Sequence, residues 1–295
     1  MRETLITGVT GQLGRGVLEA LQARNVTDSL AVLTRHPEGD TTEGFREQQL
    51  DVRIADYADR AALEKAFAGI AVLYFVSSSD IEHRLPQHEN VVAAARAAGV
   101  EHILYTSSVR KTEGPETVLH PVIEAHRQTE EWIRESGLTY TILRHNLYAD
   151  LLPFFMGAPE QLLNTDTVYL PAGAGRVALV PRDDLAEAAA TILADPAPYR
   201  NRILEFNGSE NVTFGELTEQ LSGVLGRELD YVSPSREEFR ETLRGHGVPD
   251  GAIWMTDVFA TGIADGEFSG STTDLEKVLG RRSRPLRSLL HEVYG

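Results

Sequence analysis

A glycine-rich segment near the start of the chain constrains the fold more than any other feature. It reads Gly8-Val9-Thr10-Gly11-Gln12-Leu13-Gly14, between an apolar strand that ends at Thr7 and an amphipathic helix over 12–23. The first glycine permits a sharp turn, the second lets the backbone approach a pyrophosphate, and the third lets the helix pack closely on the strand. Free N–H groups at the helix start favour phosphate. We therefore predict a dinucleotide site formed by Gly8, Thr10, Gly11, Gln12, Leu13 and Gly14.

Apolar runs and helical patterns alternate after this motif. This alternation predicts an α/β fold, a Rossmann-type doubly wound parallel sheet with helices on both faces. Asp59 is a plausible N-cap, and Thr213 with Glu216 has the spacing of a capping box, as has Ser235 with Glu238. Strands are expected over 29–34, 51–54, 71–76, 101–106, 138–143 and 203–206, and helices over 85–98, 123–136 and 183–193.

A chain of 295 residues is within reach of one large α/β domain. We expect a single NAD(P)-binding domain over 1–295, with the core sheet in about 1–145 plus later segments. The less regular second half predicts a small C-terminal substrate lobe built from about 146–172 and 228–270.

Composition excludes several kinds of site. The chain has no cysteine, and its nine histidines show no metal-binding spacing, so no metal is expected. A formal net charge of −16 repels phosphate backbones, so no nucleic-acid partner is expected. We interpret the basic run at Arg281, Arg282, Arg284 and Arg287 as a solvated terminal segment.

The chain contains no run of about 18 consecutive apolar residues, so no membrane span is predicted, and the start MRETLITG has no secretory pattern. We therefore expect a cytoplasmic protein without a membrane partner. The sequence leaves its oligomeric state open between monomer and homodimer.

The end of the second strand bears on the choice of cofactor. An acid there binds the ribose 2′-hydroxyl of NAD, whereas an arginine accepts the 2′-phosphate of NADP. This chain has Leu33-Thr34-Arg35-His36 and no acid. Arg35 therefore favours NADPH, with NADH as a weaker cofactor.

Further cofactor contacts are expected where other strands end. Asp56, followed by Tyr57, is placed to bind the adenine amino group, and the alternative interpretation is a turn aspartate. Ligands of open α/β sheets bind at the carboxyl edge of the strands. Two sets of polar residues lie at that edge. Ser77, Ser78 and Ser79 follow the fourth strand, and Thr106 and Ser107 end the fifth.

Several motifs together resemble the NmrA-like atypical short-chain dehydrogenases. They are the glycine segment, Asp56-Tyr57, Pro86-Gln87-His88-Glu89-Asn90-Val91, Ala98-Gly99-Val100, Leu143-Arg144, Ala172-Gly173-Ala174-Gly175, Asp183-Asp184 and Gly247-Val248-Pro249. Within that family the pattern is most similar to the type 2 quinone oxidoreductases and the triphenylmethane reductases. The resemblance spans essentially the whole chain and implies NADPH as hydride donor to a quinone or a cationic dye.

Two departures bear on the chemistry. Typical short-chain dehydrogenases use Tyr-x-x-x-Lys as their acid and base, but the matching helix here has His126 and Glu130 in those places, as the two similar groups do. Those groups also carry asparagine after the Leu-Arg pair, near the nicotinamide. This chain has His145 there and Asn146 next, and the sequence leaves open which of them faces the cleft.

The leading hypothesis is direct hydride transfer to a quinone-like electrophile, which needs positioning more than strong acid catalysis. His126 is a candidate proton or hydrogen-bond donor, or a histidine satisfied by a neighbour. Tyr148 is a candidate substrate contact, or a packing tyrosine. A triphenylmethane-type dye suits the same residues. The alternative from another class is a redox sensor that binds NAD(P) and catalyses little.

Overall fold

The computed structural model describes residues 3–27, 29–271 and 274–295. Its main feature is a seven-stranded sheet in the order β3-β2-β1-β4-β5-β6-β9, with every neighbouring pair parallel. This confirms the predicted doubly wound sheet. The strands are β1 (Thr4–Ile6), β2 (Leu30–Thr34), β3 (Asp51–Ile54), β4 (Val72–Phe75), β5 (His102–Ser108), β6 (Thr139–His145) and β9 (Arg202–Phe206).

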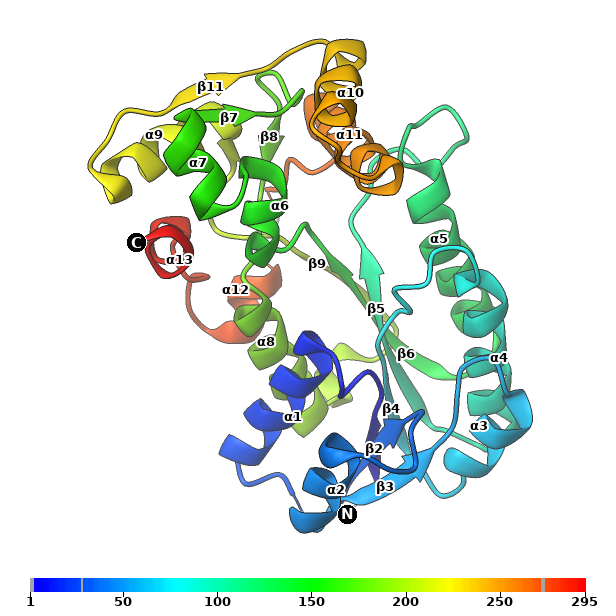
Figure 1. Ribbon diagram of the computed structural model, residues 1–295. Helices are drawn as coiled ribbons and strands as arrows, with labels where there is room; N and C mark the ends of the chain where they lie inside the picture. Colours follow the sequence, from blue (N-terminus) through cyan, green and yellow to red (C-terminus); the bar gives the residue numbers. More distant parts are fainter. Residues whose placement is uncertain (1–2, 28, 272–273) are drawn as a thin grey trace.

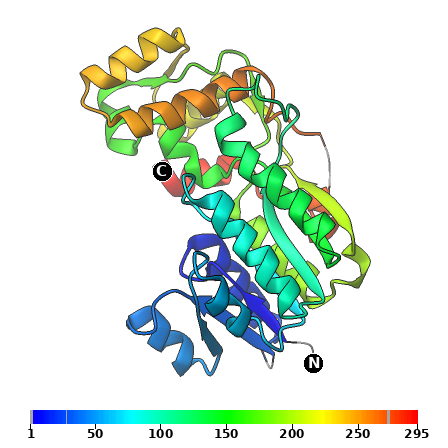
Figure 2. The same cartoon turned by 90° about the vertical axis from the view of Figure 1, so that its right-hand side faces the viewer.

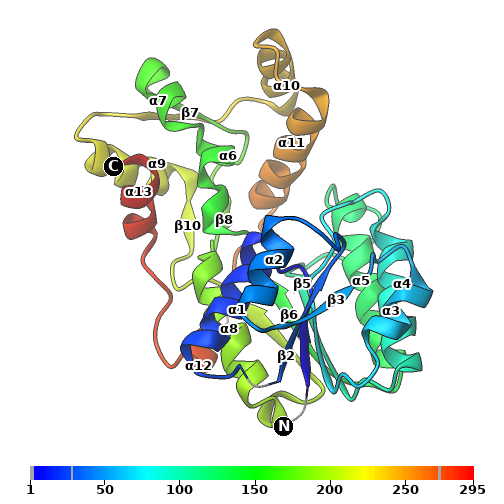
Figure 3. The same cartoon turned by 60° about the horizontal axis from the view of Figure 1, so that its bottom comes forward.

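Helices cover both faces of this sheet (Figures 1 and 3). One layer contains α1 (Gln12–Ala23), α8 (Arg182–Ala194) and α12 (Asp274–Leu279), and the other contains α3 (Arg60–Ala66), α4 (Arg84–Ala97) and α5 (His120–Glu135). The central strands are apolar and buried on both faces because each face packs on a helical layer.

Local signals in the sequence set several of these boundaries. Asp59 caps α3 by accepting a hydrogen bond from the Ala62 N–H, as predicted. Thr213 and Glu216 form the predicted capping box, and Ser235 accepts from the Glu238 N–H. One helix that the sequence patterns did not predict, α2 (Asp40–Glu47), follows β2 and contains a glycine.

A second group of elements lies above the carboxyl ends of the strands (Figure 1). In Figure 2 the dark blue strand β1 lies in the lower part of the molecule, away from the yellow and orange segments of this group at the top. The elements are η1 (Ala149–Leu151), α6 (Leu152–Met156), α7 (Pro159–Thr165), β7 (Thr167–Tyr169), β8 (Arg176–Val177), β10 (Val212–Thr213), α9 (Phe214–Leu225), β11 (Asp230–Val232), α10 (Arg236–Gly245), α11 (Asp250–Ala264) and α13 (Leu286–Tyr294), while η2 (Ala197–Tyr199) precedes β9.

The upper group packs around a hydrophobic cluster that includes Phe155, Phe214, Phe268 and Leu290 and that continues onto Ile123 of α5. This cluster draws on α9 and α13, which lie outside the ranges predicted for a substrate lobe. The division of the chain into a core and a lobe at those ranges stays a prediction.

The interpretation of the basic run as solvated was wrong for two of its arginines. Arg281 binds Asp184 and Glu187 on α8, and Arg284 pairs with Asp183 and Glu292. Asp184 is fully buried and also accepts from the Arg284 backbone N–H at 2.7 Å. These contacts hold the C-terminal segment against helix α8, which covers one face of the sheet.

Candidate active site

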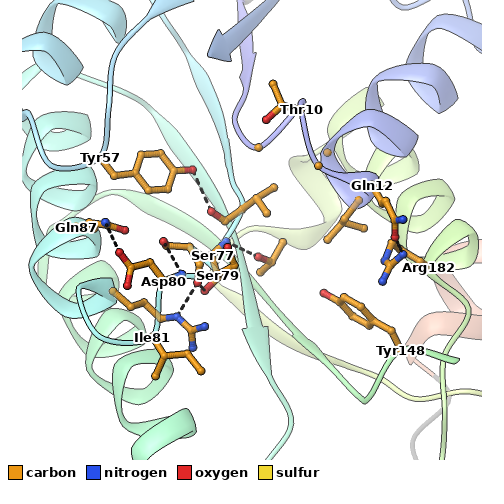
Figure 4. A pocket seen from close by; sticks show the side chains of 18 of the residues that line it. Thr10, Gln12, Tyr57, Ser77, Ser79, Asp80, Ile81, Gln87, Tyr148 and Arg182 are labelled. Atoms are coloured by element: carbon orange, nitrogen blue, oxygen red, sulfur yellow. Dashed lines mark hydrogen bonds between the residues drawn. The ribbon is translucent and has the colours of Figure 1, made fainter. Parts of the chain in front are cut away.

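A cleft with a volume of about 1220 Å³ lies at the carboxyl edge of the sheet. The glycine loop, the ends of β2, β4, β5 and β6, and residues of α6 and α11 line it. Every residue predicted for cofactor binding or catalysis is among its lining residues. Figure 4 shows Tyr57, Ser77 and Ser79 on one side of the cleft and Gln12, Tyr148 and Arg182 on the other.

The glycine loop forms a backbone cradle. Gly8 has φ +66°, and a Cβ added there would lie 2.9 Å from Val76 Cβ. A Cβ at Gly14 would collide with the Gly8 carbonyl oxygen, so α1 packs as closely on β1 as the motif predicts. Gly11 is the N-cap of α1, with no side-chain cap and no acidic residue in the first turn. This helix start therefore suits a pyrophosphate group.

Arg35 and Asp56 lie together in the lining of the cleft. The Arg35 side chain is 69% exposed, and its Nη1 lies 3.8 Å from Asp56 Oδ2. Asp56 Oδ1 accepts from the Ala58 N–H at 2.8 Å, which is the bond of a turn aspartate. Two acids that were not predicted from the sequence, Glu38 and Asp40, also line the cleft.

The predicted polar residues at the strand ends are bound to one another. The Tyr57 hydroxyl donates to the Val76 carbonyl at 3.0 Å and shares a second hydrogen bond with the Thr7 hydroxyl at 2.5 Å. The Ser77 N–H donates to Thr106 Oγ1 at 2.8 Å. The side chains of Tyr57 and Thr106 thus hold the loop after β4, and the loop's Ser77, Ser78 and Ser79 line the cleft.

A buried ion cluster supports the end of β5. Ser107 donates to Glu130 Oε1 at 2.5 Å, and Arg110 and Arg144 both bind the same carboxylate. Burial opposes the charge of Glu130, yet the hydrogen bonds from the two arginines prevail and lower its pKa to about 2. Glu130 stands where the Tyr-x-x-x-Lys pattern has its lysine, so an anchored carboxylate replaces that cation.

His126 lies where the same pattern has its tyrosine. Its Nε2 is 3.4 Å from Arg84 Nη1, and its Nδ1 is 2.9 Å from the Tyr105 hydroxyl. Because a guanidinium can only donate, Nε2 accepts and the proton resides on Nδ1. Burial first, and then the charge of Arg84, lower the pKa of His126 well below its ordinary range. The imidazole is therefore neutral, with both nitrogens engaged inside the protein.

His145 and Asn146 differ in whether the polar atoms of their side chains all have hydrogen-bond partners. Asn146 donates to Asn207 and to the Phe268 carbonyl, and its oxygen accepts from the Leu147 N–H. His145 stacks on Phe206 with ring centroids 5.8 Å apart, and its Nδ1 lies 3.2 Å from the Tyr148 hydroxyl. Its Nε2 is buried and has no hydrogen-bond partner among the described residues. Burial lowers the pKa of His145 to about 3.

Tyr148 connects His145 to an arginine that was not predicted from the sequence. The Arg182 guanidinium lies 5.1 Å from the centre of the Tyr148 ring. Arg182 also binds Gln12 of the glycine loop, and it pairs with Asp150 at 3.3 Å. Burial raises the pKa of Tyr148 to about 12 against the opposing charge of Arg182. Arg182 thereby links the cofactor loop to the segment that begins the upper group.

An apolar wall completes the cleft on the side of the upper group. It is formed by Phe154, Phe155, Met255 and Phe259, which come from α6 and α11. Phe154 is 40% exposed, which is high for a phenylalanine. Its ring therefore offers an apolar surface on which a flat apolar ligand can pack. These residues could not be identified from the sequence because they follow no strand end and match no motif.

Neither a metal site nor a membrane span is found in the described chain. Within residues 3–27, 29–271 and 274–295, no three or more His, Asp or Glu side chains are grouped so that they could hold a metal ion. Over the same residues, no helix has the length and hydropathy needed to cross a membrane.

Comparisons with known proteins agree with this geometry. Residues 8–196 match a family model described as NAD(P)H-binding. Quinone oxidoreductase 2 of Escherichia coli is 32% identical over 98% of both chains. An NmrA-like family domain-containing oxidoreductase of Aspergillus flavus is 32% identical over 98% of this chain and 94% of its own. The crystal structure of Citrobacter triphenylmethane reductase complexed with NADP(H) is 32% identical, covers 99% of each chain and has a TM-score of 0.88.

Proposed function

Because the chain belongs to the NmrA-like family of NAD(P)H-binding proteins, we propose that it is an NADPH-dependent reductase that transfers hydride to a quinone-like or other electrophilic aromatic acceptor. The observation that carries this proposal is that a single cleft contains both the glycine cradle and the aromatic wall of Phe154, Phe155 and Phe259. A cofactor and a flat apolar acceptor can therefore lie against each other.

The residues around the cleft fit a nicotinamide cofactor. The cradle excludes a Cβ at Gly8 and Gly14, the start of α1 is uncapped, and His145 presents a buried nitrogen without a partner in the described chain. When bound, NADPH supplies a hydride and its two electrons. Arg35 would bind the 2′-phosphate, the backbone of the glycine loop the pyrophosphate, and the loop of Ser77, Ser78 and Ser79 the ribose.

The protein's own contribution is positioning and the exclusion of water. His126 is neutral and bound on both nitrogens, so we assign it a positioning role beside Arg84. His145 is also neutral, and its Nε2 is available to hydrogen-bond a polar group of a bound ligand. Tyr148 orients the His145 ring through Nδ1. An acceptor that is already electrophilic suits such a site, because strong acid catalysis is not required.

The test is NADPH oxidation by the purified protein with 1,4-benzoquinone, followed at the nicotinamide absorbance and corrected for the uncatalysed reaction. NADH runs in parallel. Saturable turnover that is faster with NADPH is the expected result. Tight NADPH binding by fluorescence with no turnover of benzoquinone, or of a conjugated ketone, would overturn the proposal and favour the redox sensor.

A further inference from the structure

One cation in the cleft is placed differently from the others. Of the cleft's three described arginines, Arg35 lies 3.8 Å from Asp56 and Arg182 lies 3.3 Å from Asp150. Arg84, at the start of α4, is only 7% exposed and has no carboxylate within 4 Å among the described residues. A guanidinium stays protonated in proteins, so this is a buried positive charge without a counter-ion.

The hydrogen bonds of Arg84 orient its side chain, but their acceptors carry no negative charge. Its Nε donates to the Ser78 carbonyl at 2.7 Å, and its Nη1 reaches the Val122 carbonyl and His126 Nε2, each at 3.4 Å. Its Nη2 makes no hydrogen bond to the described part of the chain, and Arg84 belongs to the cleft lining. The guanidinium is therefore held through Nε and Nη1. Its Nη2 can still donate a hydrogen bond to a molecule bound in the cleft.

The other titratable groups near Arg84 do not supply a charge that would cancel it. His126 and His88 are neutral, because burial and the charge of Arg84 lower the pKa of both. Burial raises the pKa of Tyr105, so that hydroxyl is neutral as well. Asp80 is the carboxylate that acts on Arg84 from a longer distance, but it is solvent-exposed and bound to His83. A desolvated cation among neutral rings is suited to binding negative charge.

We propose that Arg84 stabilises the oxyanion that forms on the acceptor, so that this chain favours quinones and conjugated ketones over cationic dyes as substrates. This inference rests on the proposed function and names its substrate class. Hydride addition breaks the C–H bond at the dihydronicotinamide C4 and forms a new C–H bond at the acceptor carbon that is conjugated with the carbonyl. The C=C π electrons shift to form an enolate, so the C=O π electrons move onto the oxygen, which takes a proton from water afterwards. In a quinone, the carbon that received the hydride then loses a proton to water while the second carbonyl oxygen gains one, which gives the aromatic hydroquinone. A cationic dye becomes neutral on the same addition and gains nothing from Arg84.

Binding of a phenolate tests this without turnover. 4-Nitrophenol carries its charge on oxygen and changes absorbance when it ionises, so its pKa can be measured on the NADP⁺-saturated protein. We expect the wild-type protein to lower that pKa by at least one unit. We expect Arg84→Gln to abolish the shift and Arg84→Lys to keep part of it. Arg96→Gln, on the exposed face of the same helix, should behave as the wild type.

Turnover provides the second arm. With benzoquinone we expect Arg84→Gln to lower kcat on the order of 100-fold with little change in KM, since the charge develops only in the transition state. With a cationic triphenylmethane dye its rate should be unchanged or higher.

Equal losses with both acceptors, or an unshifted 4-nitrophenol pKa in the wild type, would overturn the role of Arg84. So would a rise in the NADPH dissociation constant that accounts for the lost turnover. None of these results would affect the proposed reductase. Conversely, a wild-type protein without quinone turnover would reject the reductase, whatever 4-nitrophenol shows.

Discussion

Burial, more than the charge of neighbouring groups, keeps three histidines at the cleft neutral, namely His88, His126 and His145. His88 accepts from the Ser78 N–H through Nε2, and its Nδ1 lies 2.8 Å from Thr129 Oγ1. Thr129 donates in turn to the Ala125 carbonyl, so His88 Nδ1 carries the proton. His88 therefore holds the loop after β4 as a neutral ring. His126 and His145 are neutral too, so the positive charge beside these rings comes from Arg84.

Arg35 should decide between the two nicotinamide cofactors. It lines the cleft, and its only carboxylate neighbour within 4 Å in the described chain is Asp56 at 3.8 Å. We expect Arg35→Ala to weaken NADPH binding by about 10- to 100-fold, the loss of one charge-assisted contact, and to change NADH binding by less than about twofold. Fluorescence titration of both cofactors measures this.

Arg60→Ala is a suitable control for that measurement, because Arg60 is an exposed arginine that pairs with Glu64 on α3 and does not line the cleft. It should leave both cofactors unaffected. Equal weakening of NADPH and NADH by Arg35→Ala would contradict the assignment.

Residues with a positional rule behind them were predictable from the sequence, and the others were not. The glycines, Arg35 and the Ser77 loop follow strand ends, and strand ends in a parallel sheet meet at one edge. Arg84 follows no such rule. Its importance depends on the absence of a counter-ion, which is a property of the packed structure. Likewise, no pattern distinguishes His145 from Asn146 before their hydrogen bonds are known.

At the scale of elements, the contact between β1 and α1 couples stability to cofactor binding. We expect Gly14→Ala to destabilise the protein by about 1–3 kcal/mol, because the added Cβ overlaps the backbone of Gly8 and must displace it. The displaced loop should also weaken NADPH binding at least tenfold. Thermal unfolding and fluorescence titration check the two effects.

Gly44→Ala provides the matched comparison, since Gly44 lies inside α2 and a Cβ added there would meet nothing within 4 Å beyond its own helix in the described chain. There the substitution should stabilise the protein by about 0.5–1 kcal/mol, as alanine does in an open helical position, and leave NADPH binding unchanged. A Gly14→Ala protein as stable as this control would show that α1 does not depend on the close approach.

At the scale of the whole molecule, the sheet and the presence of a small C-terminal lobe were predictable, but the way in which the elements of the upper group pack together was not. The sheet is built from consecutive strand–helix units whose periodicity is visible in the sequence. The upper group joins α6, α9, α11 and α13, which are far apart along the chain, around one shared hydrophobic cluster. Its strands β8 and β10 are two residues long, too short for an alternating pattern to reveal them.

The buried neutral histidines make the stability of the whole protein sensitive to acid. An exposed histidine has a pKa of about 6.5, whereas burial lowers that of His145 to about 3. Between these values the unfolded chain binds a proton that the folded chain does not, so the folded state loses stability as pH falls below 6.5. For His145 alone this loss is about 2 kcal/mol at pH 5. The measurement is the free energy of unfolding with urea at pH 7.5 and at pH 5.0. We expect His145→Asn to remove this contribution from the difference between the two values.

The comparison uses the difference between the two pH values, because His145→Asn also leaves a smaller side chain against Phe206 and lowers stability at every pH. Contributions from other buried histidines, such as His88, are common to both proteins and cancel. His246→Asn changes an imidazole that is exposed in the folded chain and should reproduce the wild-type difference. If His145→Asn does so as well, the His145 imidazole is protonated in the folded protein at pH 5, and its Nε2 then has a partner that satisfies the charge.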